Sequence, residues 1–202
     1  ARLGLFATME AVDLSPVSLG IARAAAAGEG LTNMEFREGD LNRIELAAES
    51  FDVVLMNMSL HHVEKLDRLL GQIERSLRPG GWLLLHEYVG PRQFQFPDSQ
   101  LRIVARLLGA LPERLRRDST TGEVKCEYVR RPPAWWNLAD PSEAICSDLI
   151  LSEVERRFEV VDRRDYGGAV LHLLLEHIVQ NFEAGRPDDA RWIRILGEIE
   201  AI

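Results

Sequence analysis

Acidic and amide side chains end three short apolar segments of this chain of 202 residues. Asp13 closes the first segment, Asp40 follows the second, and Asn57 closes the third. The two oxygens of one carboxylate can accept both hydroxyl protons of a ribose. Parallel strands bring such residues to one sheet edge, which is where ligands bind. The spacing therefore predicts a small-molecule site at that edge.

Asp13 and Asp40 each have a second interpretation. Asp13 can cap a helix together with Ser15, because an acid-Ser-Pro sequence is a good helix start by itself. Asp40 can accept an adenine amino proton while Leu41 packs against the ring, but Gly39-Asp40 is also a common turn sequence. Both interpretations stay open for each acid.

Groups that could transfer a proton follow the third and fourth apolar segments. They are His61, His62, His86 and Glu87, and the strongest candidates are His62 and Glu87. A histidine or a carboxylate in such a place can take the proton of a hydroxyl group that acts as a nucleophile. Paired histidines at this position can also serve only to pack the turn.

Strand and helix patterns alternate through the first 90 residues. Apolar residues recur at three- and four-residue steps from 66 to 77, which indicates a helix, and the run 51–57 suits a strand buried on both faces. The other expected strands are 8–13, 32–37 and 82–88, and the other expected helix begins at Ser15 and ends at Gly28. This alternation predicts an α/β fold with a doubly wound, mostly parallel sheet, helices on both faces and 51–57 at its centre.

Beyond residue 90 the pattern changes. We expect one domain, with a core at 1–90, a helical cap or substrate insertion at 91–146, and the C-terminal part of the core at 147–202. In this last part we expect a helix at 147–157, a strand at 158–164, a helix at 171–182 and a final helix from Pro187. Residues 1–7 are expected to be the tail of a helix.

Composition excludes several classes of function. The formal net charge is -8, which disfavours a nucleic-acid partner held by phosphate contacts. The two cysteines lie far apart, so neither a disulfide framework nor a zinc site is indicated, and we expect no metal. No apolar run is long enough to span a membrane, and a cytoplasmic location is expected.

The ordered motifs resemble class I S-adenosylmethionine-dependent methyltransferases. Residues 12–15 (Val-Asp-Leu-Ser) are similar to the ribose-binding segment of that family, and 38–41 (Glu-Gly-Asp-Leu) to its adenine-contacting turn. Residues 51–62 resemble its fourth strand with the loop beneath the methionine moiety, and 77–81 (Leu-Arg-Pro-Gly-Gly) the turn after it. The resemblance implies S-adenosylmethionine as cofactor. The residues that it assigns to cofactor binding are Asp13, Leu14, Asp40, Leu41, Asn57 and Met58.

One family feature has no counterpart here. The first strand of the family and its glycine-rich loop are missing, and that strand would lie between 8–13 and 51–57. We therefore expect this chain to be an excerpt of a longer polypeptide, and the last strand of the family is also not evident.

Three functions follow from this comparison. The first is methyl transfer to a small-molecule acceptor, with His61, His62 or Glu87 as the base. Residues 87–91 resemble methyltransferases of surface-polysaccharide gene clusters, which makes a sugar hydroxyl the expected acceptor. The second is a non-catalytic methyltransferase-like module. The third is an NAD-dependent oxidoreductase of the short-chain type, although its Tyr-x-x-x-Lys pair is absent.

Overall fold

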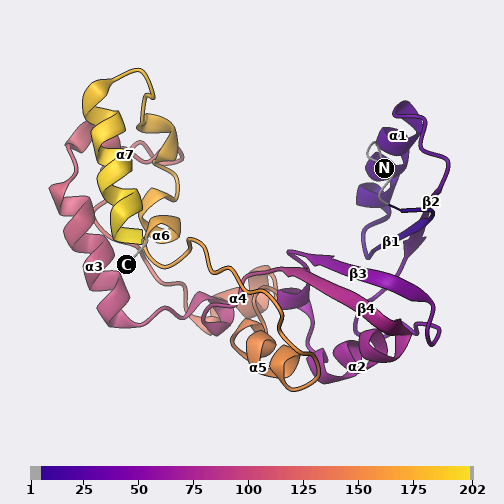
Figure 1. Ribbon diagram of the computed structural model, residues 1–202. Helices are drawn as coiled ribbons and strands as arrows, with labels where there is room; N and C mark the ends of the chain where they lie inside the picture. Colours follow the sequence, from indigo (N-terminus) through magenta and orange to yellow (C-terminus); the bar gives the residue numbers. More distant parts are fainter. Residues whose placement is uncertain (1–5, 201–202) are drawn as a thin grey trace. The chain divides into compact units, whose positions relative to one another are not determined.

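The structure, a computed structural model, describes residues 6–200 and divides them into two compact units (Figure 1). The first unit runs to Glu87 and includes Ile150–Phe158, and the second contains Tyr88–Leu149 and the chain from Glu159. Most of the expected helix at 1–7 lies outside the described residues, and Phe6 and Ala7 are not helical. No helix in the range 6–200 has both the length and the apolar character needed to cross a membrane.

Parallel strand pairs form the first unit. Strand β1 (Met9–Asp13) pairs in parallel with β2 (Met34–Glu38), and helix α1 (Pro16–Gly28) connects them. Strand β3 (Phe51–Asn57) pairs in parallel with β4 (Leu77–His86). Parallel neighbours need a crossover connection, and a helix supplies it in each pair. The α/β class with parallel strands, predicted from the sequence, is confirmed.

Helix α2 (Leu66–Ser76) is the crossover between β3 and β4. Its apolar stripe is fully buried, as expected from the three- and four-residue spacing, and consists of Leu66, Leu69, Leu70 and Ile73. The helix ends at Ser76, earlier than the Pro-Gly-Gly sequence, because β4 already begins at Leu77. Gly81 lies inside β4, where a Cβ would come within 2.9 Å of the Arg78 carbonyl oxygen and 3.1 Å of the Asp52 carbonyl oxygen, so this position needs glycine.

Helix α5 (Ile150–Glu155) belongs to the first unit and packs against α2. Arg157, just beyond α5, pairs with Asp67 and donates to Glu74 at 3.0 Å. The Arg157 hydrogen bond is the main reason that the pKa of Asp67 is lowered. A short helix from a distant part of the sequence is thereby held against the crossover helix.

The strands of the described residues form two separate two-stranded sheets. The prediction that 51–57 lies at the sheet centre is wrong for the described residues, because among their strands β3 pairs with β4 alone and a central strand needs a ladder on both edges. One face of this pair is correspondingly exposed. The register places Val53 opposite Trp82 and Leu55 opposite Leu84, and all four side chains are exposed.

Helix α1 begins after Ser15 and ends at Gly28, as predicted, but Gly28 itself does not adopt the left-handed conformation that we expect of a capping glycine. Ser15 is the N-cap, and its hydroxyl accepts a hydrogen bond from the Ser18 amide at 3.2 Å. The left-handed residue after the helix is Gly30, with a φ of 67°, and not the expected Gly28. Gly28 stays helical because the amides of Glu29, Gly30 and Leu31 all donate to the last helical carbonyls.

Helices build the second unit. They are α3 (Asp98–Ala110), α4 (Pro133–Ala139), α6 (Leu171–Leu175) and α7 (Pro187–Glu200). The expected helix 171–182 is wrong in its extent: α6 ends at Leu175, and a single 3-10 turn follows at Val179–Asn181. His177 interrupts the segment with a φ of 59°.

The expected strand at 158–164 is wrong. Residues 159–166, all within the described range, form neither helix nor strand, and Val161 is exposed. An apolar run becomes a strand only where a neighbouring edge completes its hydrogen bonds, and no described strand pairs with this segment.

Substitution of a core leucine tests the second unit. Leu173 is 0% exposed and Leu138 is 88% exposed. Leu173→Ala is expected to lower the free energy of unfolding by about 2–5 kcal/mol in a urea titration, because it removes buried apolar volume. Leu138→Ala makes the same chemical change on the surface, and its free energy of unfolding should stay within about 0.5 kcal/mol of the wild-type value. Equal effects would contradict the core assignment.

An ion pair between the exposed Arg114 and the buried Asp189 joins two segments of the second unit. The Asp189 carboxylate is fully buried and accepts hydrogen bonds from both terminal nitrogens of the Arg114 guanidinium. It also accepts a hydrogen bond from the backbone amide of Glu183 at 3.1 Å. The hydrogen bonds from Arg114 lower the pKa of Asp189 to about 2, against an ordinary value of 3.8.

The pH dependence of stability tests this pair. A carboxyl group whose pKa is lowered by folding stabilises the native state fully above its unfolded pKa, and this contribution disappears as pH falls through the folded pKa. The stability difference between the wild type and Asp189→Asn should be large at pH 7 and shrink between pH 3.8 and about 2. Unfolding in urea at a series of pH values measures it, and a difference that does not change over this range would contradict the account.

Candidate functional site

The carboxyl ends of β1 and β2 bring two of the predicted acids to one edge. The Gly39 amide donates to the Asp13 carbonyl oxygen at 3.0 Å, so the turn that carries Asp40 begins beside Asp13. A Cβ on Gly39 would come within 2.8 Å of the Val12 side chain. Glycine therefore allows this turn to pass close to β1.

Asp13 has a structural partner of its own. Its Oδ1 accepts a hydrogen bond from the Ser15 amide at 2.7 Å, and the residue is exposed at the start of α1. The helix-capping interpretation thus has a contact in the structure. A carboxylate oxygen has more than one acceptor site, so this contact is compatible with ligand binding. The adjacent Leu14 side chain is also exposed.

Asp40 organises the turn after β2. Its Oδ1 accepts from the Asn42 amide at 2.8 Å, and its Oδ2 lies 3.4 Å from the Arg43 Nε. Leu41 is half-buried beside it. The carboxylate thus remains partly exposed at the strand edge.

Asn42 joins this turn to the loop after β3. Its Oδ1 accepts hydrogen bonds from the amides of Glu64 and Lys65, each at 3.0 Å. Arg68 of α2 strengthens the junction by donating to the carbonyls of Arg43 and Ile44. The loops that carry Asp40 and the histidine pair are therefore fastened together by hydrogen bonds. Sequence reasoning missed Asn42, although an asparagine is a good acceptor for the free amides at a helix start.

At the carboxyl ends of β3 and β4, Asn57 contacts His86. The Asn57 Oδ1 lies 2.7 Å from the His86 Nδ1, and both residues are exposed. Met58 follows with a φ of 48°, a conformation unfavourable for a residue other than glycine, and its side chain is 47% exposed. The Met58 amide donates to the His86 carbonyl at 2.8 Å. Strained residues of this kind gather at ligand sites.

Glu87 lies beneath the same loop. Its Oε1 accepts from the amides of Ser59 and Leu60, each at 2.6 Å, and its Oε2 lies 2.8 Å from the His61 Nδ1. Burial by itself raises the pKa of Glu87, but the hydrogen bonds from His61, Leu60 and Ser59 outweigh it, so the pKa is lowered. Glu87 is a buried, ionised acceptor.

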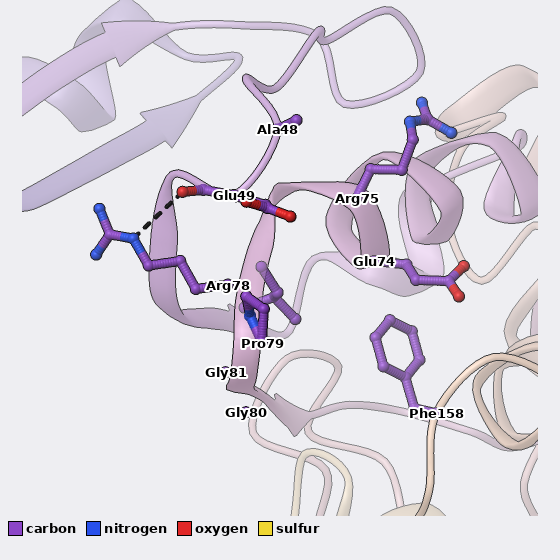
Figure 2. A pocket seen from close by; sticks show the side chains of 10 residues that line it. Ala48, Glu49, Glu74, Arg75, Arg78, Pro79, Gly80, Gly81 and Phe158 are labelled. Carbon is purple, nitrogen blue, oxygen red and sulfur yellow. Dashed lines mark hydrogen bonds between the residues drawn. The ribbon is translucent and has the colours of Figure 1, made fainter.

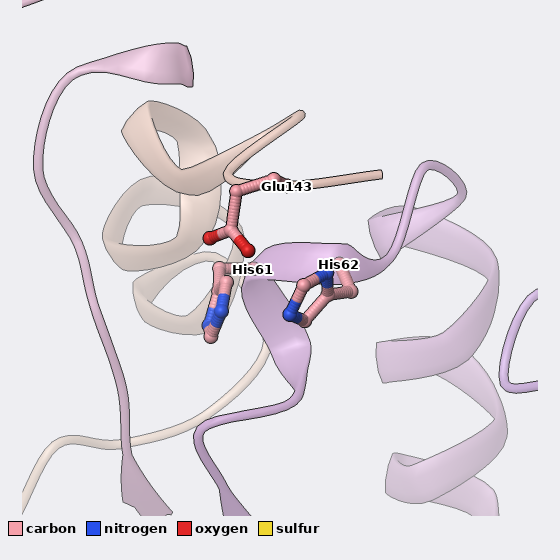
Figure 3. Close-up of side chains that lie close together, drawn as sticks. All are labelled: His61, His62 and Glu143. Atoms are coloured by element: carbon pink, nitrogen blue, oxygen red, sulfur yellow. The ribbon is translucent and has the colours of Figure 1, made fainter. Parts of the chain in front are cut away.

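The two histidines share a 3-10 turn, Leu60–His62. Their ring centroids are 4.3 Å apart, with 40° between the ring planes, and Figure 3 shows the rings side by side. His61 is buried and His62 half-buried. The turn thus gives the two imidazoles different surroundings. The His61 ring lies beside the Glu87 carboxylate, and the His62 ring lies nearer to the surface.

A hollow of about 520 Å³ lies at the opposite, amino ends of β3 and β4 (Figure 2). Its lining includes Glu74, Arg75, Arg78 and Phe158, and none of the predicted site residues. Arg78 is already engaged, because it pairs with both oxygens of Asp52 and donates to the Glu49 carbonyl. Ligands of parallel α/β sheets bind at the carboxyl ends of the strands, so we favour the Asp13–Asp40 edge over this hollow.

Two substitutions of Asn42 test the junction. Asn42→Ala removes the acceptor of two amides and should lower the free energy of unfolding by about 1 kcal/mol in a urea titration. Asn42→Asp keeps an acceptor oxygen and adds negative charge near the start of α2, so its free energy of unfolding should be close to that of the wild type. Equal losses in the two variants would show that these hydrogen bonds do not hold the loops together.

Known proteins resemble mainly the first part of this chain. Residues 1–85 match the family model described as a methyltransferase domain. The chain is 30% identical over 111 residues to a malonyl-[acyl-carrier protein] O-methyltransferase of Halalkalibacterium halodurans, which covers 54% of this chain and 40% of that protein. It is 35% identical over 85 residues to a ubiquinone biosynthesis O-methyltransferase of Sinorhizobium fredii, covering 42% of this chain and 33% of the relative.

A solved structure shows the same partial overlap. The S-adenosylmethionine-dependent methyltransferase of Mesorhizobium loti is 30% identical, with a TM-score of 0.38, and the match covers 42% of this chain and 39% of that one. The chain thus spans about two fifths or less of the length of these similar proteins.

Proposed function

We propose that the protein is a cytoplasmic enzyme that transfers a methyl group from S-adenosylmethionine to a small molecule. The match of residues 1–85 to the methyltransferase domain model supports this proposal and agrees with the motifs in the sequence. The observation that carries this proposal is the junction at Asn42, which unites the turn of Asp40 with the loop after Asn57. This junction ties the turn after β2 to the loop after β3, which supports a site shared by these strand ends.

The side chains at this edge suit a nucleoside with a cationic group. Asp13 offers carboxylate oxygens to ribose hydroxyls, and Asp40 offers one to the adenine amino group while Leu41 contacts the ring. The exposed Leu14 extends the apolar surface, and Asn57 and Met58 border the place of the methionine moiety. The net charge of -8 favours a cation over an anion.

Chemistry at this site needs little from the protein beyond placement and one proton acceptor. The cofactor supplies an electrophilic methyl group when it is bound. An acceptor hydroxyl loses its proton as it reacts, and an imidazole is suited to take it near neutral pH. We assign that role to the histidine pair and within it favour His62, which is the less buried of the two.

We propose an oxygen atom as the methyl acceptor. Two similar proteins carry the word O-methyltransferase in their names, which supports this choice. An oxygen acceptor also agrees with the proton-accepting role that we assign to the histidine pair. The sugar hydroxyl expected from residues 87–91 is the first acceptor to assay. Quinol and malonyl-carrier substrates form the comparison set.

The main alternative is a non-catalytic module with the same fold. Calorimetric titration with S-adenosylmethionine and with NAD separates the alternatives. Heat with S-adenosylmethionine alone supports the proposal, heat with NAD alone supports an oxidoreductase, and no heat with either leaves the non-catalytic module.

Substitution of Asp13 tests the ribose contact. Asp13→Asn keeps an oxygen that can accept from the Ser15 amide, so the start of α1 should survive. Hydrogen bonds to a charged group contribute about 1.5–3 kcal/mol, so the Kd for S-adenosylmethionine should rise about ten- to a hundredfold. Glu35→Gln removes the same charge from an exposed position inside β2 and should leave the Kd within about twofold. A Kd that both variants share with the wild type would refute the assignment of Asp13.

A further inference from the structure

A single carboxylate at the end of β4 holds the loop that follows β3. The Glu87 carboxylate accepts hydrogen bonds from the backbone amides of Ser59 and Leu60 and contacts the His61 Nδ1. The Glu87 side chain is 2% exposed. These three contacts use both carboxylate oxygens. A carboxylate engaged in this way is poorly placed to abstract a proton from a substrate, since every contact favours its remaining ionised.

We infer that Glu87 is a positioning residue: it holds residues 58–61 in the conformation that the proposed cofactor site requires, and it keeps the proton of neutral His61 on Nδ1. The inference rests on the proposed function for its effect on cofactor binding. Its effect on the loop and on the imidazole does not depend on that function.

The loop conformation needs such support. Met58 adopts a φ of 48°, and strained backbone of this kind costs on the order of 1–3 kcal/mol. The hydrogen bond from Met58 to the His86 carbonyl and those from Ser59 and Leu60 to Glu87 offset this cost. In the proposed site, Asn57 and Met58 lie beside the methionine moiety of the cofactor. Loss of the Glu87 contacts would therefore let the cofactor-binding part of the loop leave this conformation.

The state of His61 follows from the chemistry of its partner. An ionised carboxylate only accepts hydrogen bonds, so the 2.8 Å contact requires Nδ1 to be the donor. A neutral imidazole with its proton on Nδ1 has the acceptor lone pair on Nε2. Glu87 thereby determines which nitrogen of the ring can accept a proton.

Glu87→Gln is the decisive variant because it preserves size. Its amide oxygen can still accept from Ser59 and Leu60, but its NH₂ group then faces the His61 Nδ1 and donates. The proton of neutral His61 should therefore move to Nε2. Nitrogen-15 NMR of labelled histidine distinguishes a protonated ring nitrogen from an unprotonated one, and we expect Nδ1 to change from the first to the second. The Kd for S-adenosylmethionine should rise about tenfold or more.

Glu87→Ala supplies a second readout. Hydrogen exchange of the Ser59 and Leu60 amides should accelerate about tenfold or more, since both lose their acceptor. The matched control is Glu38→Gln, which alters an exposed carboxylate at the end of β2. It should change neither the histidine spectrum nor the exchange of these amides.

The outcomes separate the two proposals. If the wild type does not bind S-adenosylmethionine, the proposed function fails, while the imidazole and exchange measurements still test Glu87. If the wild type binds but Glu87→Gln keeps both its Kd and the proton on Nδ1, the positioning role is overturned. A wild-type His61 with its proton on Nε2 would overturn it without any variant.

Discussion

The side chain of Asn42 makes the contact on which the candidate site depends. Parallel pairing aligns β1 with β2 and β3 with β4, but the two ladders remain separate sheets among the described residues. Asn42 bridges them at their carboxyl ends. Its backbone amide donates a hydrogen bond to the Asp40 carboxylate, and its side-chain oxygen accepts hydrogen bonds from the backbone amides of Glu64 and Lys65. Hydrogen bonds from Arg68 to the same turn reinforce the bridge. Two loops that are distant in sequence are therefore joined by hydrogen bonds at this junction.

The carboxylates of the site divide into two kinds by their surroundings. Asp13 and Asp40 are exposed or partly exposed and keep acceptor capacity toward solvent, which suits contact with a ligand. Glu87 is buried, and its oxygens accept from backbone amides and an imidazole. In our proposal the same functional group serves recognition at the strand edge, where it is exposed, and support beneath the loop, where it is buried. Burial and hydrogen-bond partners decide between these roles.

The sequence predicted the first unit well where the pattern was local. The apolar stripe of α2 and the Ser15 cap depend on residues near one another in the chain, and each is confirmed. The parallel pairing is confirmed as well, because the alternation of strand and helix patterns predicts a crossover helix between paired strands. Expectations failed where a remote partner decides the outcome. Within residues 6–200, the segment 158–164 has an apolar pattern but no strand edge to complete its ladder, and β3 has no second neighbouring strand. The roles of Asn42 and Glu87 arise from contacts across about 20 to 30 residues, which neither periodicity nor motif spacing reveals.

The central claim is that the nucleoside binds at the carboxyl ends of β1, β2 and β3. Titration of the labelled protein with S-adenosylhomocysteine, followed through backbone amide NMR signals, tests it most directly. We expect the largest shifts at Asp13, at 39–42 and at 57–60. Shifts confined to the hollow at the amino ends of β3 and β4, around Glu49 and Arg78, would contradict the account.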